Sequence, residues 1–214
     1  MQAADAAEQI RDVLKEEREE HAATERFRAQ AALLIAVLAM LLAITSLGGG
    51  NVTEDMLNAN IHASDTWAFY QAKNVRQTMV ELAAEELELE LRREQETLSS
   101  EVRKAYESKI AEYRARAERY ESEPDPEAPN DPTRGEGKKE LFARARHYEA
   151  QRERAQEQDP NFDFAEALYQ IAIVLGSVAI LATSRTILWL SVAMGVVASV
   201  LMLNGFFLWF RLPI

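Results

Sequence analysis

Three long stretches almost free of charge constrain this chain more than any other feature of its sequence. Residues 29–47 and 186–210 carry no charged side chain. Residues 165–183 carry a single acid, Glu166. A helix needs about 20 predominantly apolar residues to cross the hydrocarbon core of a membrane, whereas a soluble protein would have to bury helices that are apolar on every face. The sequence therefore predicts an all-α membrane protein with three transmembrane helices.

The connections between these stretches predict how they are arranged. Only Ser184 and Arg185 separate the second stretch from the third, so these two helices must form an antiparallel hairpin. Gly48, Gly49 and Gly50 follow the first stretch. Because glycine weakens a helix, we expect these residues to end the first span.

A cleavable signal peptide is the alternative interpretation of the first stretch. Signal peptides have a short basic start and an apolar core of roughly 7–15 residues. Here residues 1–28 are highly charged, and the apolar block that follows them is longer than such a core. We therefore expect residues 1–28 to form a charged helix and residues 29–47 to be retained as a membrane helix.

Basic residues flank the stretches unevenly, which predicts an orientation. Four of them precede the first stretch: Lys15, Arg18, Arg26 and Arg28. No lysine or arginine follows it until Lys73. Because positive charge favours the cytoplasmic side, we place the N-terminus and Arg185 there and residues 48–164 outside. Arg152 and Arg154 argue the other way, but they belong to a long loop, and long loops translocate largely regardless of charge.

Aromatic residues also stand where belts at the membrane surfaces are expected. Phe27 and Trp189 would lie at the inner surface. Four others would lie at the outer surface, namely Phe162, Phe164, Trp209 and Phe210. With the N-terminus inside, three spans place the C-terminus outside.

The charged remainder of the chain is acidic. The formal net charge is −11, and the last 50 residues contribute only one acid and two arginines. An acidic surface is a poor ligand for nucleic acid, whose phosphates require basic groups, so we expect no nucleic-acid partner. The chain has no cysteine, which excludes disulfides, thiolate nucleophiles and thiolate metal sites.

The segment between the first two stretches has the composition of long helices. Residues 53–120 contain neither proline nor glycine, and apolar residues recur there at helical spacing. They keep a three–four rhythm up to Leu98 and then step by four as far as Ile110. Consecutive four-residue steps indicate a stutter in a coiled coil. Residues 97–101 are also rich in serine and threonine, so a helix break is the alternative.

A proline-rich hinge follows this helical segment. Residues 122–137 hold four prolines and two glycines, so they cannot continue a helix. A second helix is expected from Lys138 to Gln158, where Asp159 and Pro160 would end it. At 1.5 Å per residue the first arm would be roughly 100 Å long and the second about 30 Å. Either the first arm folds back near residues 97–101, or its excess packs against other protomers.

A segment early in this domain carries a resemblance to a known family. Residues 63–76 read ASDTWAFYQAKNVR. This segment resembles a bacterial membrane family known as domain of unknown function number 4337. The order of the other elements is similar too: a charged N-terminal helix, one span, a coiled helical region and a closing two-span hairpin. The resemblance covers most of the chain. It implies a protein of the bacterial inner membrane, and it implies no activity. In such a membrane, the orientation inferred from the basic residues places residues 48–164 in the periplasm. Four residues match the motif without an assigned role, namely Trp67, Tyr70, Gln71 and Lys73.

The motif itself has two physical interpretations. Trp67, Tyr70 and Lys73 are three residues apart, so they share one face of a helix. This stripe either packs on a neighbouring helix near the membrane or recognises a ligand or protein partner through its two aromatic anchors.

The sequence shows no constellation of catalytic or metal-binding residues. His21, His62 and His147 stand singly in charged segments, without the fixed spacing of metal ligands. His62, Ser64 and Asp65 are too close along a helix to form a catalytic triad. We therefore expect no metal, no cofactor and no enzymatic activity.

The apolar stretches contain small and polar residues that bear on assembly. Ser191, Gly195 and Ser199 recur every four residues, and Ala172 and Gly176 offer a matching notch on the second stretch. Small residues at this spacing let two membrane helices approach closely. Three further polar residues lie in the stretches, namely Glu166, Gln170 and Asn204. Such groups mark either a helix–helix bond or a conduction pathway.

These observations favour a non-enzymatic, oligomeric scaffold or docking protein of the membrane. The narrow apolar seams of the helical domain favour partner helices, so we expect a homo-oligomer and a possible protein partner. The alternative is a channel or transport component lined by the second and third spans. It is suggested by the small residues that recur every four positions and by Gln170 and Asn204.

Overall fold

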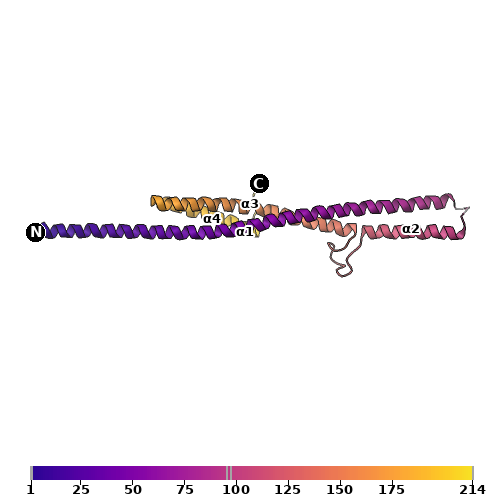
Figure 1. Ribbon diagram of the computed structural model, residues 1–214, viewed down its shortest axis with the longest axis horizontal. Coiled ribbons are helices and arrows are strands. Elements are labelled where there is room, and N and C mark those ends of the chain that lie inside the picture. Colours follow the sequence, from indigo (N-terminus) through magenta and orange to yellow (C-terminus); the bar gives the residue numbers. More distant parts are fainter. Residues whose placement is uncertain (1, 95, 97, 214) are drawn as a thin grey trace. The chain divides into compact units, whose positions relative to one another are not determined.

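The computed structural model describes residues 2–94, 96 and 98–213, and it describes side chains from residue 11 onward except those of residues 12, 13 and 16. These residues form helices without any strand. The helices are α1 (Gln2–Arg93), α2 (Ser100–Glu121), α3 (Lys138–Ala182) and α4 (Arg185–Phe207), as Figure 1 shows. Part of α1, part of α3 and all of α4 are apolar and long enough to cross a membrane.

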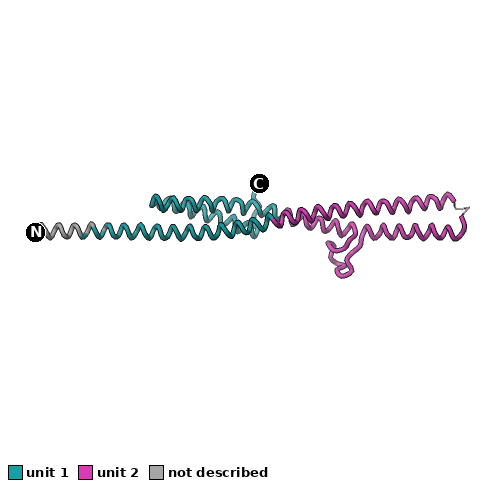
Figure 2. Tube along the Cα trace, viewed as in Figure 1, with its two compact units in different colours: residues 1–53, 155–214 teal, residues 54–154 magenta. Residues whose placement is uncertain are grey.

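The chain divides into two compact units (Figure 2). The first combines residues 1–53 with residues 155–214, and the second is the continuous segment 54–154. These boundaries differ from the expected domain 48–164 by several residues at each end. The residues just inside each end of the expected domain belong to the first unit instead, because they pack on each other there.

The three glycines do not end the first helix, so that expectation is wrong. The helix α1 continues through Gly48 and its neighbours without interruption. A glycine inside a helix costs only about 1 kcal/mol relative to alanine, and here close packing offsets this cost. A Cβ on Gly48 would lie 2.7 Å from Phe162 Cε1 and 2.9 Å from Phe206 Cζ, and one on Gly205 would lie 2.8 Å from Phe162 Cε2. The glycines form the notch that receives the Phe162 ring.

Pro160 does not end the third helix either, so this second expectation is also wrong. It lies inside α3, which joins the expected second arm to the expected second span. A proline inside a helix costs about 3 kcal/mol. The next two residues, Asn161 and Phe162, are almost completely buried. Asn161 Nδ2 donates to the Glu157 carbonyl across the proline at 2.9 Å. Tertiary packing therefore holds the chain helical where its local sequence favours a stop.

The region around residue 97 is a helix break and not a stutter. The helix α1 ends at Arg93, and α2 begins at Ser100. The Ser99 hydroxyl accepts a hydrogen bond from the amide of Val102 at 3.3 Å, which is the usual role of serine at a helix N-cap. The first arm thus folds back on itself, as one of the two alternatives predicted.

The returning helix α2 runs antiparallel to the end of α1 (Figure 1). Tyr106 donates from its hydroxyl to Glu90 at 3.3 Å, and Arg114 forms an ion pair with Glu88. The residues of α1 that face inward recur in a strict three–four rhythm and are all buried or half-buried. We call this set the inner seam: Ala59, Ala63, Thr66, Tyr70, Lys73, Gln77, Val80, Ala84, Leu87 and Leu91. The buried residues Ile110 and Ala117 of α2 and Leu141 and Ala145 of α3 complete the core of the second unit.

The first unit has a core made from α1, α3 and α4. It consists of Leu38, Ala165, Tyr169, Ala172, Ala198 and Met202. The tight turn between α3 and α4 places Thr183 in the left-handed region, with φ of 49°. The helix α4 ends at Phe207, three residues before the expected end of the span. The reason is Leu208, which is also left-handed and whose amide donates to the Asn204 carbonyl at 2.7 Å.

Candidate functional site

The stripe formed by Trp67, Tyr70 and Lys73 lies within the second unit and contacts α3. The indole Nε1 of Trp67 donates to Glu149 Oε1 at 2.9 Å. Its ring meets the rings of Phe142 and Tyr70 edge-on, with centroids 5.5 Å apart in both pairs. Aromatic pairs in this geometry contribute about 0.5–1.5 kcal/mol beyond the area they bury. The two aromatic residues therefore join α1 to the first half of α3.

Lys73 connects the same face of α1 to the proline-rich segment. Its side chain is buried, and Nζ lies 3.5 Å from Glu123 Oε2 and 3.7 Å from Glu136 Oε2. The ammonium also lies 5.7 Å from the centroid of the Tyr120 ring. Because a buried charge is costly unless it is paired, these contacts fix Lys73 and hold both ends of the proline-rich segment close to α1.

The proline-rich segment, residues 122–137, is a structured loop. The amide of Glu136 donates to the Glu123 carbonyl at 2.9 Å. Arg144 donates from Nε and Nη2 to two carbonyls of the loop, each at 2.7 Å. Gly135 has a φ of +121°, and a Cβ there would lie 2.4 Å from the Glu123 carbonyl oxygen. Only glycine fits this position, so the loop depends on it.

Glu140 anchors the start of α3 to the end of α2. Its carboxylate accepts a hydrogen bond from the Ser122 hydroxyl at 2.7 Å and another from the Glu123 amide at 3.1 Å. Burial alone would raise the pKa of Glu140, but these hydrogen bonds outweigh it and hold the pKa below its usual value. The group is therefore ionised at neutral pH.

The stripe has little room for a ligand beside it. Tyr70, Phe142 and Lys139 line a hollow of about 200 Å³, together with Lys138 and Glu121. Lys138 and Glu121 already form an ion pair at 3.1 Å. Ligand sites usually enclose about 300–1,000 Å³. The contacts of Trp67, Tyr70 and Lys73 therefore favour a packing role for the stripe over ligand recognition.

A second apolar seam runs along the opposite side of α1 and is exposed. Ile61, Ala68, Val75, Leu82 and Leu89 follow one another at intervals of seven residues, and all five are exposed. The large members leave more than half of their surface uncovered, from 53 % for Val75 to 59 % for Leu82 and Leu89. Together with Ala72 and Met79 between them, we call these residues the outer seam. Nothing in the described part of the second unit covers it.

The small residues of the expected second and third spans pack against one another. Ser191 is buried, and its hydroxyl donates to the Ala172 carbonyl at 2.6 Å. A Cβ on Gly176 would lie 3.3 Å from Ser191 Oγ and 2.9 Å from Ile35 Cγ1. These residues let α3 approach both α4 and α1 closely.

Gly195 and Ser199, the other two small residues of α4, contact α1 and α3 as well. A Cβ on Gly195 would lie 2.6 Å from Leu38 Cδ2. Ser199 donates to the Gly195 carbonyl at 2.8 Å, and its oxygen also lies 2.8 Å from the hydroxyl of Tyr169. Ser191, Gly195 and Ser199 therefore serve contacts inside one chain.

The polar residues of these spans lie in different surroundings. Asn204 is fully buried; its Nδ2 donates to Asn161 Oδ1 at 2.7 Å and to the Phe210 carbonyl at 2.9 Å, and its Oδ1 accepts from the Phe210 amide at 3.0 Å. Every polar atom of its side chain is thus used within the protein. Gln170 is exposed and donates to the carboxylate of Glu166 at 3.3 Å, one turn away on α3.

The described side chains form no cluster suited to metal binding. No group of three histidine, aspartate or glutamate residues could hold a metal ion in the part of the chain whose side chains are described, and two of the histidines have other contacts. His62 stacks on Tyr148 with centroids 5.1 Å apart, and His147 lies 2.9 Å from the Gln151 amide.

Sequence reasoning missed two features that shape these sites. The outer seam was overlooked, although its seven-residue spacing is visible in the sequence from Ile61 to Leu89. Asn161 and Phe162 were not expected to pack beside Asn204 and Gly48. The local pattern contains no sign of these pairings, since they join residues on three different helices.

One comparison with known proteins identifies the family. The family described as domain of unknown function (DUF4337) matches residues 27–208, which is most of the chain. The chain belongs to this family. The resemblance seen at residues 63–76 is therefore confirmed, and in this DUF4337 member the motif residues Trp67, Tyr70 and Lys73 join α1 to α3 and the proline-rich loop. No curated protein and no solved structure matches the chain.

Proposed function

We propose that this DUF4337 protein is a non-enzymatic, oligomeric scaffold of the bacterial inner membrane that presents its helical hairpin on the periplasmic side. Three apolar helices would anchor it, and the outer seam would join copies of the chain. The observation that carries the proposal is the outer seam, because it is a long heptad pattern that the second unit itself leaves exposed.

The first unit supports the membrane part of the proposal. The three apolar stretches of this unit carry large exposed apolar side chains, which include Leu33, Leu47, Val174, Leu181 and Val196, 58–85 % exposed. In water this surface would be a large aggregation-prone patch, whereas lipid tails would cover it at no cost. The basic residues near Arg26 and at Arg185 support an inward N-terminus.

The size of the outer seam fits a contact between two copies. Its five large side chains, with Leu57 and Phe69 beside them, are each exposed by 53–63 %. Each of these seven side chains exposes on the order of 100 Å² of apolar surface, so together they offer about 700 Å² per copy. A standard interface buries about 800 Å² per partner.

The pattern of the outer seam also fits a second copy. Apolar residues repeated every seven positions match the seam of a left-handed coiled coil. Copies inserted in one membrane share an orientation, so a two-fold axis along the membrane normal sets each seam residue opposite its own counterpart. The seam positions between Ile61 and Leu89 carry no charge except at Asp65 and Glu86, so self-contact over Ala68 to Leu82 brings no like charges together.

Disulfide crosslinking tests this contact directly, because the chain contains no native cysteine. Val75→Cys and Leu82→Cys are expected to give a covalent dimer on mild oxidation of native membranes. Glu81→Cys is the matched control, since Glu81 is exposed but lies about 100° or more away from the seam on α1. If both seam variants stay monomeric, or if the control variant forms as much covalent dimer as they do, the proposed contact between outer seams is wrong.

A second test does not depend on cysteine. Val75→Glu combined with Leu82→Glu places charge in the seam without touching the inner seam, so helicity is expected to stay unchanged. The oligomer, measured by native mass spectrometry, is expected to shift to smaller species. An unchanged oligomer would show that another surface joins the copies.

A channel or transport component remains the second candidate, and one observation favours it. Glu166, which is half-buried, and Gln170, which is exposed, form a polar pair in the part of α3 (residues 165–183) that is otherwise largely apolar. In an assembly this pair would face another copy and line a polar path. Ion flux through liposomes that is lost in Gln170→Leu would support this role. Asn204 supports it less, because its side chain is fully bonded within the chain.

A further inference from the structure

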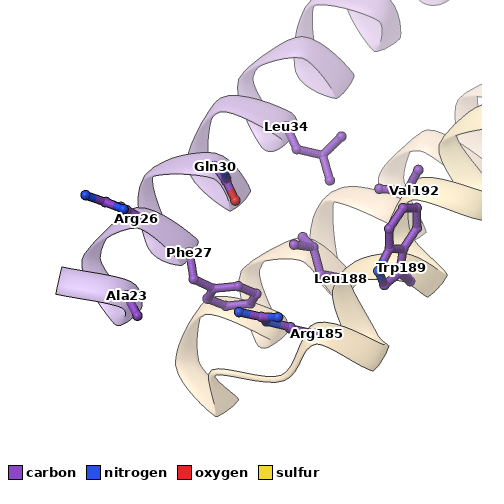
Figure 3. Close-up of a pocket in the computed structure, with 9 residues that line it drawn as sticks. All are labelled: Ala23, Arg26, Phe27, Gln30, Leu34, Arg185, Leu188, Trp189 and Val192. Atoms are coloured by element: carbon purple, nitrogen blue, oxygen red, sulfur yellow. The ribbon is translucent and has the colours of Figure 1, made fainter. Parts of the chain in front are cut away.

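An open cavity of about 620 Å³ lies in the first unit, between α1 and the start of α4 (Figure 3). One end of the cavity is polar and basic, with Arg26 and Gln30 on α1 and Arg185 on α4. The other end is apolar, with Leu34 on α1 and Val192 on α4. Because the numbering of both helices rises in this direction, the cavity passes from the charged end of the bundle into its apolar part.

The two arginines are available to a ligand. The side chains of Arg26 and Arg185 form no ion pair or hydrogen bond with any described residue, and both residues are exposed. Arg185 lies beside the ring of Phe27 in Figure 3. Arg26 extends away from α4 in the same view and would have to turn toward the cavity, a change that exposed side chains make in picoseconds to nanoseconds.

The chemistry of these groups selects a phosphate. Guanidinium groups hold phosphate oxygens with two parallel hydrogen bonds. Arg185 is also the first residue of α4, where the positive end of the helix adds to the attraction for an anion. The exposed indole of Trp189, 72 % uncovered, lies one turn further along α4, beside Val192 in Figure 3, and is suited to the boundary between headgroups and acyl chains.

We propose that this cavity binds the phosphate headgroup of an anionic phospholipid, with Arg185 and Arg26 holding the phosphate and Leu34 and Val192 contacting an acyl chain. The inference rests on the membrane placement proposed above. A lipid fits better than a free phosphate ion because the cavity continues from the arginines into an apolar groove, which a free ion would leave empty.

Native mass spectrometry of the full-length protein tests the site. The protein would be purified in mild detergent and titrated with phosphatidylglycerol or with phosphatidylcholine of the same acyl chains. Phosphatidylglycerol is expected to bind more tightly. Each arginine near a headgroup contributes about 1 kcal/mol, or about fivefold in affinity, so Arg26→Gln and Arg185→Gln are each expected to lower that preference by about fivefold.

Arg211→Gln is the matched control. Arg211 is an exposed arginine of the same unit, but it is paired with Glu157 at 3.1 Å and is not among the residues that line the cavity. Its substitution is expected to leave the lipid preference unchanged. An unchanged preference in Arg26→Gln and Arg185→Gln, or an equal loss in Arg211→Gln, would overturn the proposal.

Two further measurements separate the possible causes of failure. Displacement of the bound lipid by inorganic phosphate would assign the site to a free anion and overturn the lipid assignment. Flotation of native membranes reports on insertion independently. A chain that floats with membranes but shows no preference for phosphatidylglycerol refutes the lipid site alone, whereas a chain that does not float refutes the membrane placement itself.

Discussion

Replacement of Asn204 by alanine is expected to weaken the first unit strongly. The Asn204 side chain is fully buried and makes hydrogen bonds to Asn161 and Phe210. The backbone groups of Phe210 can turn to water, because this residue is 43 % exposed. Asn161 Oδ1 cannot, because Asn161 is completely buried.

The expected loss of stability has two contributions, the lost hydrogen bonds and the buried Asn161 oxygen that is left without a donor. A lost hydrogen bond costs about 0.5–1.5 kcal/mol, and a buried acceptor left without a partner costs about 1–3 kcal/mol. Asn204→Ala is therefore expected to lower the free energy of unfolding by about 2–4 kcal/mol. In the double variant Asn161→Ala, Asn204→Ala no acceptor is left unpaired, so its cost should fall below the sum of the two single variants by about 1–2 kcal/mol.

Reversible unfolding in mixed detergent micelles, followed by circular dichroism, measures these free energies. The four proteins of the double-mutant cycle would be compared under one set of conditions. Additive single effects would refute the reasoning, since they would show that the two amides do not depend on each other.

The remaining predictions concern both units. Gly48→Val is expected to lower the free energy of unfolding by about 1–3 kcal/mol, because its Cβ would meet Phe162 at 2.7 Å; Gly50→Ala, where a Cβ meets no atom within 4 Å, should be neutral or stabilising in the same assay. Lys73→Met is expected to release the proline-rich loop, seen as faster cleavage there by a protease, and an unchanged rate would count against the ion pairs. The pKa of Glu140 is lower in the folded protein than in the unfolded chain, so its stabilising contribution is present above the unfolded pKa and is lost as the pH falls through the folded pKa. Glu140→Gln should accordingly reduce the loss of stability on acidification, and an identical pH profile would refute this role.

Several elements of the fold were predictable from the sequence because local composition decides them. The three apolar helices, the turn at Ser184 and the start of α3 at Lys138 follow from hydropathy, spacing and proline content. The serine-rich region near residue 97 indicated two alternatives, and the N-cap at Ser99 shows which one the chain adopts.

The sequence by itself determined that the chain is helical and that three of its segments are apolar enough to span a membrane, because propensity and hydropathy add up along a local window. Only the tertiary structure decided that α1 continues through Gly48 and α3 through Pro160, because the Phe162 ring and the Asn161 amide outweigh a local cost of a few kcal/mol. It also decided the surroundings of the motif, since the bond from Trp67 to Glu149 joins residues 82 positions apart. Contacts at that separation exist only after the helices have packed, so no local sequence pattern could predict them.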